Sequence, residues 1–522
     1  MADTVALLDP ELVRPKRGAG WRSILPLLAP AGLLGLTLLA YVRFLGIGFV
    51  ASDSLPLIDA SRLTRVTDVV ELFRKPVMAG TPFAAIETVY RPFVSVMFGV
   101  EYAVWGLNAL GYHLTNLVLH CVSVLVVWRL LALLGLRWWS CVIGAGVFAL
   151  HPLVVVSVPV IARRDSIVPV TAFMSAWLLL IVAERAVGRA RSAALSASVV
   201  LAAIALLSKE SAFAAVGLLP LLVAARACAD GVGWRTALSR ASIVAPYVAV
   251  AAAVFVVRYT VLGGMGGSAD LSEDIPWDRY TQILGAYTRG LIWSFSGLAS
   301  ANHAVWPILA GGLLVGLGVA SVYLPRRQAV LVLVGLGWLV SFGVFAMVFR
   351  VTTVGWLAYY ALPGLAIVWA AGLEGALGRL RARGPKLRLV SATALLVVLA
   401  GLGLSWLATS ALVRGYDQWQ FAGDVSRQYV DALTRCTAAS PDVGHVRLDG
   451  MPSLVDDGQA DTNQLGVTLF EGYTIEAALR LLFPHRELTL TVWSRETLRR
   501  VGQTFTLACE SDSTRVYLVA SY

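Results

Sequence analysis

The chain of 522 residues is 58% hydrophobic and only 14% charged, and its mean hydropathy is +0.74. Soluble globular proteins carry roughly a quarter charged residues, so this composition excludes an ordinary soluble domain and indicates a polytopic membrane protein. The net charge of +10 does not indicate nucleic-acid binding, because the basic residues stand in short loops between apolar runs.

The N-terminal segment predicts a membrane anchor. Arg14, Lys16, Arg17 and Arg22 precede an apolar run that begins at about residue 23. This run is longer than the roughly 7–15 apolar residues of a cleaved signal peptide. We therefore expect a cytoplasmic tail over residues 1–22 and a first helix that stays in the membrane.

Further apolar runs approach the ~20 residues that a spanning helix needs. They predict a polytopic α-helical protein with about eleven transmembrane helices, at 23–47, 111–134, 138–157, 166–184, 192–208, 211–228, 241–261, 303–323, 328–349, 353–376 and 389–410. With a cytoplasmic N-terminus, every loop predicted to be inside contains arginine or lysine, as the positive-inside rule requires. The transmembrane domain is thus expected over 23–410, with its first outer loop at 48–110.

Two apolar stretches, 91–107 and 287–300, are left out of this count. Counting either one alone would reverse the sidedness of every later loop, so we expect interfacial or re-entrant helices at the outer face. The more polar residues 411–522 then lie outside the cytoplasm, where a mixture of helical and β-like patterns predicts a small α/β domain. Its Cys436 and Cys509 are candidates for a disulfide, although the two thiols could equally stay separate.

The costly polar residues converge on one extracytoplasmic mouth in this topology. Asp53 stands in the first outer loop, while His113, Asn116 and His120 share one helix face by their spacing. The other members are Arg91, His151, Arg163, Arg164, Asp165, Lys209, Glu210, Arg258 and Tyr360. Each residue alone has an ordinary explanation, such as a snorkelling arginine or an exposed ion pair. Together, cations around a carboxylate indicate a site for an anionic lipid head group, because arginine and lysine bind phosphate.

Residues 90–120 resemble the segment after the first outer loop in membrane mannosyltransferases of the GT-C superfamily. The resemblance is greatest to the protein O-mannosyltransferase-like group whose animal members carry tetratricopeptide repeats. The motifs that carry it are YRP at 90–92, GYH at 111–113, Asn116, LH at 119–120, His151-Pro152, the outer turn at 163–165, LLSKES at 206–211 and RYTVLGGMGG at 258–267. The similar region covers about half of the chain, from Phe49 to Gly267.

The resemblance implies a GT-C-like fold, a polyprenyl-phosphate-linked sugar as donor and transfer on the extracytoplasmic face. It implies that Asp53 is the catalytic carboxylate, because Asp53 has the place of that family's acidic residue in the first outer loop. By matching positions, Arg91, Lys209 and either Arg163 or Arg164 would hold the donor phosphate. Residues implied to position donor or acceptor are His113, Asn116, His151, Asp165, Glu210, Arg258 and Tyr360.

The sequence also departs from the family pattern. Ser52 stands where a second acid often occurs, Val156 replaces a glutamate, and tetratricopeptide repeats do not occur in these 522 residues. No cofactor is assigned for this reason, and a divalent cation is left open.

The combined prediction is an integral multi-pass protein of the cytoplasmic (plasma) membrane. It would transfer a sugar from a polyprenyl-phosphate donor to an acceptor hydroxyl on a protein, a glycan or a lipid. The alternatives are a transporter or flippase of a lipid-linked saccharide and a non-catalytic relative. A transporter would favour internal repeats and ionisable groups near the bilayer midplane, whereas these groups gather at one face.

Overall fold

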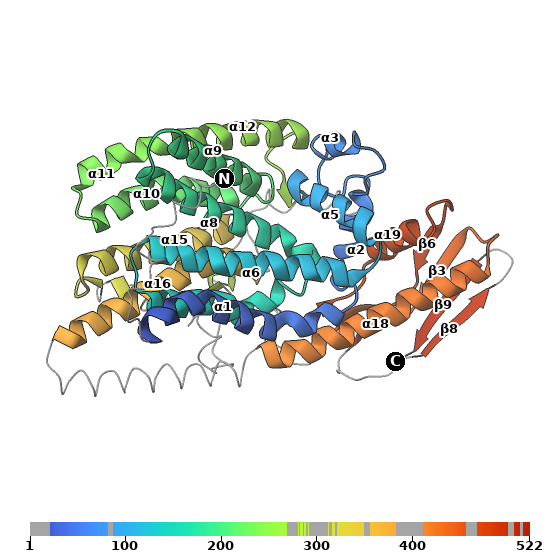
Figure 1. The fold of residues 1–522 in the computed structure, drawn as a ribbon. Coiled ribbons are helices and arrows are strands. Elements are labelled where there is room, and N and C mark those ends of the chain that lie inside the picture. The colour runs from blue at the N-terminus through green and yellow to red at the C-terminus, as the bar shows by residue number, and fades with distance from the viewer. Residues whose placement is uncertain are drawn as a thin grey trace.

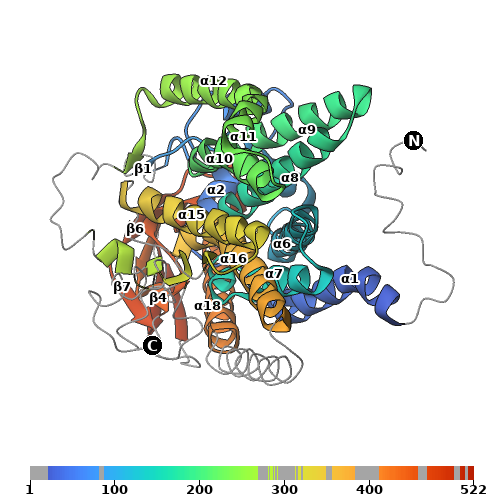
Figure 2. The same cartoon turned by 90° about the vertical axis from the view of Figure 1, so that its left-hand side faces the viewer.

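A helical bundle and a C-terminal domain with β-sheet make up the fold, and the strands lie at one end of the bundle (Figure 1). The computed structural model describes residues 21–81, 87–268, 321–348, 355–382, 411–455, 467–498, 506–511 and 515–521, with scattered positions between 280 and 318. Viewed from the other end of the bundle, the helices pack around α8, with α1, α9 and α12 at the periphery (Figure 2).

Within the described residues, eight helical segments are long and apolar enough to cross a membrane. They are formed by α1 (Trp21–Tyr41) with the 3-10 turn η2 (Val42–Gly46), α6 (Ala109–Leu133), α8 (Arg164–Arg185), α9 (Gly188–Leu206), α10 (Ala212–Ala229), α11 (Trp234–Arg240) with α12 (Ala245–Leu262), α15 (Arg326–Val348) and α16 (Gly355–Ala382). The protein is therefore an integral multi-pass membrane protein, as the composition indicated.

The expected number of eleven spanning helices is not confirmed. The run at 138–157 forms only the shorter helix α7 (Trp138–Leu150), followed by the 3-10 turn η3 (Pro152–Val156). The break falls at His151-Pro152 because a residue before proline disfavours the α-helical region. The run at 389–410 lies outside the described residues, and that at 303–323 almost entirely so.

The two omitted apolar stretches have different outcomes. Residues 91–107 form α5 (Pro92–Trp105), which is too short to be one of the candidate spans. This length agrees with an interfacial helix and leaves the order of the later loops unchanged. The stretch at 287–300 lies outside the described residues except for isolated positions.

Loops that the sequence places in the cytoplasm meet at one end of the bundle, which we call the basic end. Arg185 donates to the backbone oxygen of Leu133 at 2.8 Å, and Arg327 pairs with Asp230 at 2.9 Å. Gly135 packs against the same guanidinium of Arg327. Four loops from separate parts of the chain therefore lie on the same side.

The first loop lies at the opposite end, beside the C-terminal domain; we call this the domain end (Figure 1). The loop contains α2 (Ser54–Ala60), α3 (Asp68–Leu72) and the strand β1 (Glu87–Thr88), and leads into α5. β1 pairs antiparallel with β2 (Gly267–Ser268), just after α12. Asn108 then caps the N-terminus of α6, because its side chain accepts a hydrogen bond from the backbone of Leu110.

The C-terminal domain begins with the long amphipathic helix α18 (Ala411–Ala439), as Figure 1 shows. Its four-stranded sheet has the order β6 (Thr489–Val492), β3 (His445–Asp449), β9 (Arg515–Ser521) and β8 (Thr506–Ser511). β3 runs parallel to both neighbours, and β8 is antiparallel to β9. A smaller sheet combines β5 (Val467–Thr468), β4 (Met451–Val455) and β7 (Arg495–Leu498), and α19 (Gly472–Leu482) packs nearby. This is the α/β domain expected at the C-terminus.

A disulfide and a close approach to the first loop hold α18 in place. Cys436 on α18 is bonded to Cys509 on β8, with 5.8 Å between their Cα atoms. Farther toward the bundle, the hydroxyl of Ser426 donates to the backbone oxygen of Phe49 at 2.5 Å. A Cβ atom at Gly48 would lie 2.9 Å from the backbone oxygen of Gly423, so glycine permits this close approach. The C-terminal domain is thereby tied to the first loop.

Candidate active site

Seven charged side chains gather at the domain end, and we call them the ionic cluster. Five are linked by ion pairs: Arg91, Asp165, Lys209, Glu210 and Arg258. The other two, Asp53 and Arg163, form a pair of their own, and the charge of Arg163 acts on Asp165 and Lys209. The seven side chains come from the first loop, the starts of α5 and α8, the turn between α9 and α10, and the end of α12. The four cations and three carboxylates give a formal net charge of +1, which suits an anionic ligand.

Arg91 is the centre of the ionic cluster. One of its terminal nitrogens donates to Asp165 at 2.7 Å, while Nη2 and Nε donate to the two oxygens of Glu210 at 2.6 and 3.2 Å. Lys209 Nζ also lies 3.0 Å from the carboxylate of Asp165. The two-pronged Arg91–Glu210 contact is the strongest geometry for such a pair, so it fixes the orientation of the guanidinium.

The turn between α9 and α10 carries charge in a largely desolvated place. Burial raises the pKa of Glu210, but the charge and hydrogen bonds of Arg91 lower it more, so the pKa falls to about 2. Burial lowers the pKa of Lys209, and the negative charge of Asp165 opposes that change. Glu210 is therefore ionised at neutral pH.

Asp53 lies at the edge of the ionic cluster and touches two parts of the protein. Its Oδ2 atom is 3.7 Å from Nη2 of Arg163. Its Oδ1 atom accepts hydrogen bonds from the hydroxyls of Tyr473 at 3.2 Å and Ser52 at 3.4 Å. Two residues before Asp53, Ala51 has φ +70°, a left-handed conformation that costs a non-glycine residue about 1–2 kcal/mol. Such strain concentrates at functional sites.

Tyr473 is a site residue that the sequence analysis missed. It belongs to α19 of the C-terminal domain, where the neighbouring Thr474 donates to the backbone oxygen of Ser52 at 2.8 Å. About two turns farther along α19 than Tyr473, Arg480 donates to Asp59 at 2.7 Å. No local pattern around Tyr473 signals this role, because its partner Asp53 is 420 residues away in the chain.

Arg164 is placed differently from the expected phosphate ligand. Its side chain is completely buried, and its three nitrogens donate to Asn116 at 3.0 Å, to the backbone of Tyr112 at 3.1 Å and to Glu101. The guanidinium also stacks over the ring of Phe98, 4.6 Å from its centroid. All three nitrogens of this buried guanidinium are engaged by protein groups, so we propose Arg163 rather than Arg164 as the phosphate ligand.

The neighbouring Arg163 takes the place that faces Asp53. Arg163 ends the 3-10 turn η4 (Ile161–Arg163) and Arg164 is the first residue of α8, and their side chains pair with Asp53 and Glu101 respectively. The partner of Arg164 is Glu101 on α5, a carboxylate that the sequence analysis left without a role. The sequence signals a role for Glu101 only through its apolar neighbours, because a charged residue in an apolar helix requires a partner.

Three of the expected positioning residues are buried, and their side chains form hydrogen bonds with backbone groups of nearby loops. His113 lies 3.3 Å from the backbone oxygen of Gly48, and the Asn116 amide donates to the oxygen of Val160 at 3.0 Å. His151 accepts from the backbone nitrogen of Leu153 at 3.2 Å, and burial lowers its pKa to about 3. These side chains shape the loops around the site.

Tyr360 and Arg258 are nearer to the charges. The hydroxyl of Tyr360 donates to the backbone oxygen of Asp165 at 3.3 Å, and its ring lies 5.9 Å from Lys209 Nζ. Arg258 is 3.8 Å from Glu210 and donates to the backbone oxygen of Met265 at 3.2 Å. α12 ends between Arg258 and Met265. Gly263 caps the helix with a φ of +68°, which turns the chain back toward Arg258.

The donor set around Asp53 does not suit a divalent cation. Among the described residues, no group of three His, Cys, Asp or Glu side chains is placed to hold a metal ion. The side chain of Asp53 contacts two hydroxyls and the guanidinium of Arg163, whereas magnesium and calcium prefer several carboxylate or carbonyl oxygens. We therefore assign no metal ligand.

Fold and site together define the class: a multi-pass membrane protein with a buried ionic cluster and a carboxylate in its first loop. No protein-family model matches the chain. Over 191 residues, 36% of the chain, it is 29% identical to "Protein O-mannosyl-transferase Tmtc1" of Drosophila melanogaster and to "Protein O-mannosyl-transferase TMTC3" of Homo sapiens. The resemblance to this group is thereby confirmed, although the match spans only 22% and 20% of the two relatives.

Solved structures give weaker likenesses. ArnT from Cupriavidus metallidurans bound to undecaprenyl phosphate is 14% identical, with a TM-score of 0.47, covering 88% of this chain and 85% of that chain. The archaeal oligosaccharyltransferase AglB from Archaeoglobus fulgidus, in complex with an inhibitory peptide and a dolichol-phosphate, is also 14% identical. Its TM-score is 0.45, covering 88% of this chain and 64% of that chain.

Proposed function

We propose that the protein is a glycosyltransferase that moves a sugar from a polyprenyl-phosphate donor to an acceptor hydroxyl at the extracytoplasmic face. The observation that carries this proposal is the position of Asp53, whose carboxylate adjoins the ionic cluster through Arg163 at 3.7 Å. A base and a group of cations are thus neighbours, which a transfer away from phosphate requires. The names of the curated relatives support a sugar as the transferred group.

In the proposed reaction Asp53 accepts the proton of the acceptor hydroxyl while that oxygen attacks the anomeric carbon. The bond between the anomeric carbon and the phosphate oxygen breaks, and its electrons stay on the departing polyprenyl phosphate. Arg163, Arg91 and Lys209 stabilise the charge that develops there. A single displacement of this kind inverts the anomeric configuration.

The carboxylates of the ionic cluster preorganise its cations. Glu210 and Asp165 hold Arg91 by hydrogen bonds from all three of its nitrogens, and Asp165 also holds Lys209. Cations fixed in this way need little reorganisation when a phosphate leaves. Arg258 adds a fourth positive charge beside Glu210.

We place the active site on the extracytoplasmic side of the cytoplasmic membrane. The support is the separation of the two ends of the bundle, since loops with Arg185 and Arg327 meet at the basic end while Asp53 lies at the domain end. Short basic loops are retained in the cytoplasm, so the domain end is assigned outward.

Transfer by the full-length protein in vesicles tests the proposal. We expect wild type to move radiolabelled sugar from one of a panel of polyprenyl-phosphate sugars to a protein, glycan or lipid acceptor. Asp53→Asn should reduce the rate by roughly 10²–10⁴-fold, the usual contribution of a general base. Asp68→Asn is the matched control, because Asp68 is an exposed carboxylate of the same loop that only accepts hydrogen bonds from Thr64 and Arg65.

Three outcomes contradict the proposal. Normal turnover by Asp53→Asn would remove Asp53 from the chemistry. Movement of the lipid-linked sugar across the vesicle membrane without transfer would select a transporter. Neither transfer nor movement with any donor would select a non-catalytic relative.

A further inference from the structure

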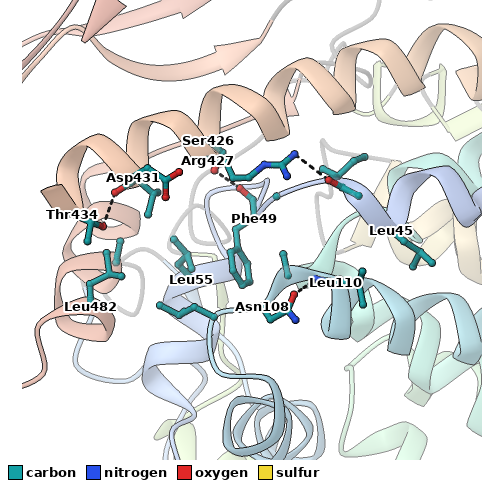
Figure 3. Close-up of a pocket in the computed structure, with 17 residues that line it drawn as sticks. Leu45, Phe49, Leu55, Asn108, Leu110, Ser426, Arg427, Asp431, Thr434 and Leu482 are labelled. Carbon is teal, nitrogen blue, oxygen red and sulfur yellow. Dashed lines mark hydrogen bonds between the residues drawn. The ribbon is translucent and has the colours of Figure 1, made fainter. Parts of the chain in front are cut away.

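A cavity of about 520 Å³ lies next to the loop that carries Asp53 (Figure 3). Its walls come from the end of η2, the first loop, the start of α6, and the helices α18 and α19. The apolar side chains in its lining include Leu45, Phe49, Leu55, Leu110, Val430 and Leu482. We call this cavity the interface pocket. Its volume and mostly apolar lining are typical of a pocket for a small organic ligand.

The interface pocket and the ionic cluster lie on either side of Asp53. Phe49 and Leu55 flank Asp53 in the chain, and both line the pocket. α19 contacts Asp53 through Tyr473 and lines the pocket through Leu482, roughly 14 Å farther along the helix. The Oδ2 atom of Asp53 therefore faces Arg163 of the ionic cluster. Its Oδ1 atom faces Tyr473 on α19, the helix that also lines the interface pocket.

The pocket is continuous with surface that faces lipid. On α6, Leu110, Leu114 and Val118 are 48%, 38% and 51% exposed, and their i, i+4, i+8 spacing puts them on one face. Large apolar side chains exposed on a spanning helix are in contact with the bilayer. Leu110 belongs both to this stripe and to the pocket wall. The first spanning segment repeats the pattern, with exposed Val42 one turn before the pocket residue Leu45.

We propose that the interface pocket binds the alkyl chain of a membrane lipid whose head group supplies the acceptor hydroxyl. The proposal rests on the proposed function and selects a lipid among its acceptors. A chain can enter from the bilayer along the Leu110 stripe, and its polar head would meet the rim formed by Asn108, Arg427 and Thr434 (Figure 3). The donor phosphate then occupies the opposite side of Asp53, at the ionic cluster.

Photolabelling tests occupancy without requiring transfer. The full-length protein is placed in vesicles of phosphatidylethanolamine and phosphatidylglycerol, with a trace of phosphatidylglycerol that carries a diazirine in one acyl chain. After irradiation, we expect labelled peptides from the pocket-lining parts of α18 and α19. Val430→Trp should reduce this label at least fivefold, because the half-buried Val430 lines the pocket. Gln428→Trp, exposed on the same helix and not part of the lining, should not reduce it.

Transfer kinetics test the acceptor assignment. An octyl glycoside should have a KM at least a hundredfold lower than the corresponding methyl glycoside, because each buried methylene is worth about fourfold in affinity. Val430→Trp should remove most of that advantage, whereas Gln428→Trp should keep it.

The outcomes separate this inference from the proposed function. If Asp53→Asn is labelled in the pocket but the wild type transfers no sugar, the pocket still binds a lipid, and that lipid is not an acceptor. Label confined to the outward faces of α1 and α6, or unchanged by Val430→Trp, would overturn the inference while transfer persists. Transfer to a soluble peptide that Val430→Trp impairs, without acyl-chain label, would assign the pocket to a peptide.

Discussion

The adjacent residues Arg163 and Arg164 give the sharpest prediction, because the structure assigns them opposite roles. We expect Arg164→Lys to impair folding and Arg163→Gln to impair transfer. Lysine keeps the positive charge of Arg164 but cannot reproduce a planar group with three hydrogen-bonded nitrogens. Glutamine at position 163 removes the charge that faces Asp53.

The size of the stability effect follows from the burial of Arg164. Its side chain is completely buried and donates to Glu101, Asn116 and the backbone of Tyr112. Lysine keeps the charge but cannot reach all three acceptors, and each buried acceptor left without a partner costs about 1–3 kcal/mol. That is a large part of the ~5–15 kcal/mol by which a folded protein is stable. Arg164→Lys should therefore lower the melting temperature and the yield of folded protein.

In the proposed reaction Arg163 acts on the chemistry. Its side chain is partly exposed and 3.7 Å from Asp53, whereas that of Arg164 is completely buried, so Arg163→Gln should lower stability less than Arg164→Lys does. Loss of one group that stabilises a departing anion typically costs 10²–10³-fold in rate. The assays are thermal unfolding of the purified protein and initial rates of sugar transfer in vesicles.

The reasoning is refuted by the reverse pattern. If Arg164→Lys unfolds at the wild-type temperature but has lost transfer, Arg164 acts at the phosphate. If Arg163→Gln transfers sugar at the wild-type rate, the ionic cluster does not extend to Asp53 in function. Glu101→Gln is an independent check, because it should destabilise the protein as Arg164→Lys does.

Two further predictions concern protons. Tyr473→Phe removes a hydrogen bond to the proposed base Asp53 and keeps the aromatic ring, so the transfer rate should fall roughly tenfold. A wild-type rate in Tyr473→Phe would show that this hydrogen bond does not serve the reaction. The pKa of Glu210 falls from 4.5 to about 2 on folding, so its contribution is complete above pH 4.5 and is lost toward pH 2. Glu210→Gln should flatten the decline of melting temperature over this window, and an unchanged slope would contradict the assignment.

The C-terminal domain is part of the site in this structure. Tyr473 contacts Asp53, and Arg480 pairs with Asp59 in the same loop. The disulfide between Cys436 and Cys509 joins α18 to the sheet of that domain. The domain thus positions the loop of the proposed base, which makes it more than a cover over the membrane region.

The sequence by itself determined the membrane class and the position of the spanning segments. Hydropathy is a local property, so the runs that became α6, α8 and α15 were recognisable without any contact. The motif order from Tyr90 to Gly267 likewise indicated the mannosyltransferase-like group, which the curated relatives confirmed. The interruption at His151-Pro152 shortened one predicted span, because proline chemistry overrode hydropathy there.

Only the tertiary structure decided which polar residues meet. Arg91 reaches Asp165 and Glu210 across 74 and 119 residues, and no spacing rule connects such distances. Hydropathy assigns both Arg163 and Arg164 to the same turn, whereas the structure ends a 3-10 turn at Arg163, begins α8 at Arg164, and pairs the first with Asp53 and the second with Glu101. Side-chain direction and long-range packing are set by the whole bundle, which is why they could not be obtained from the chain alone.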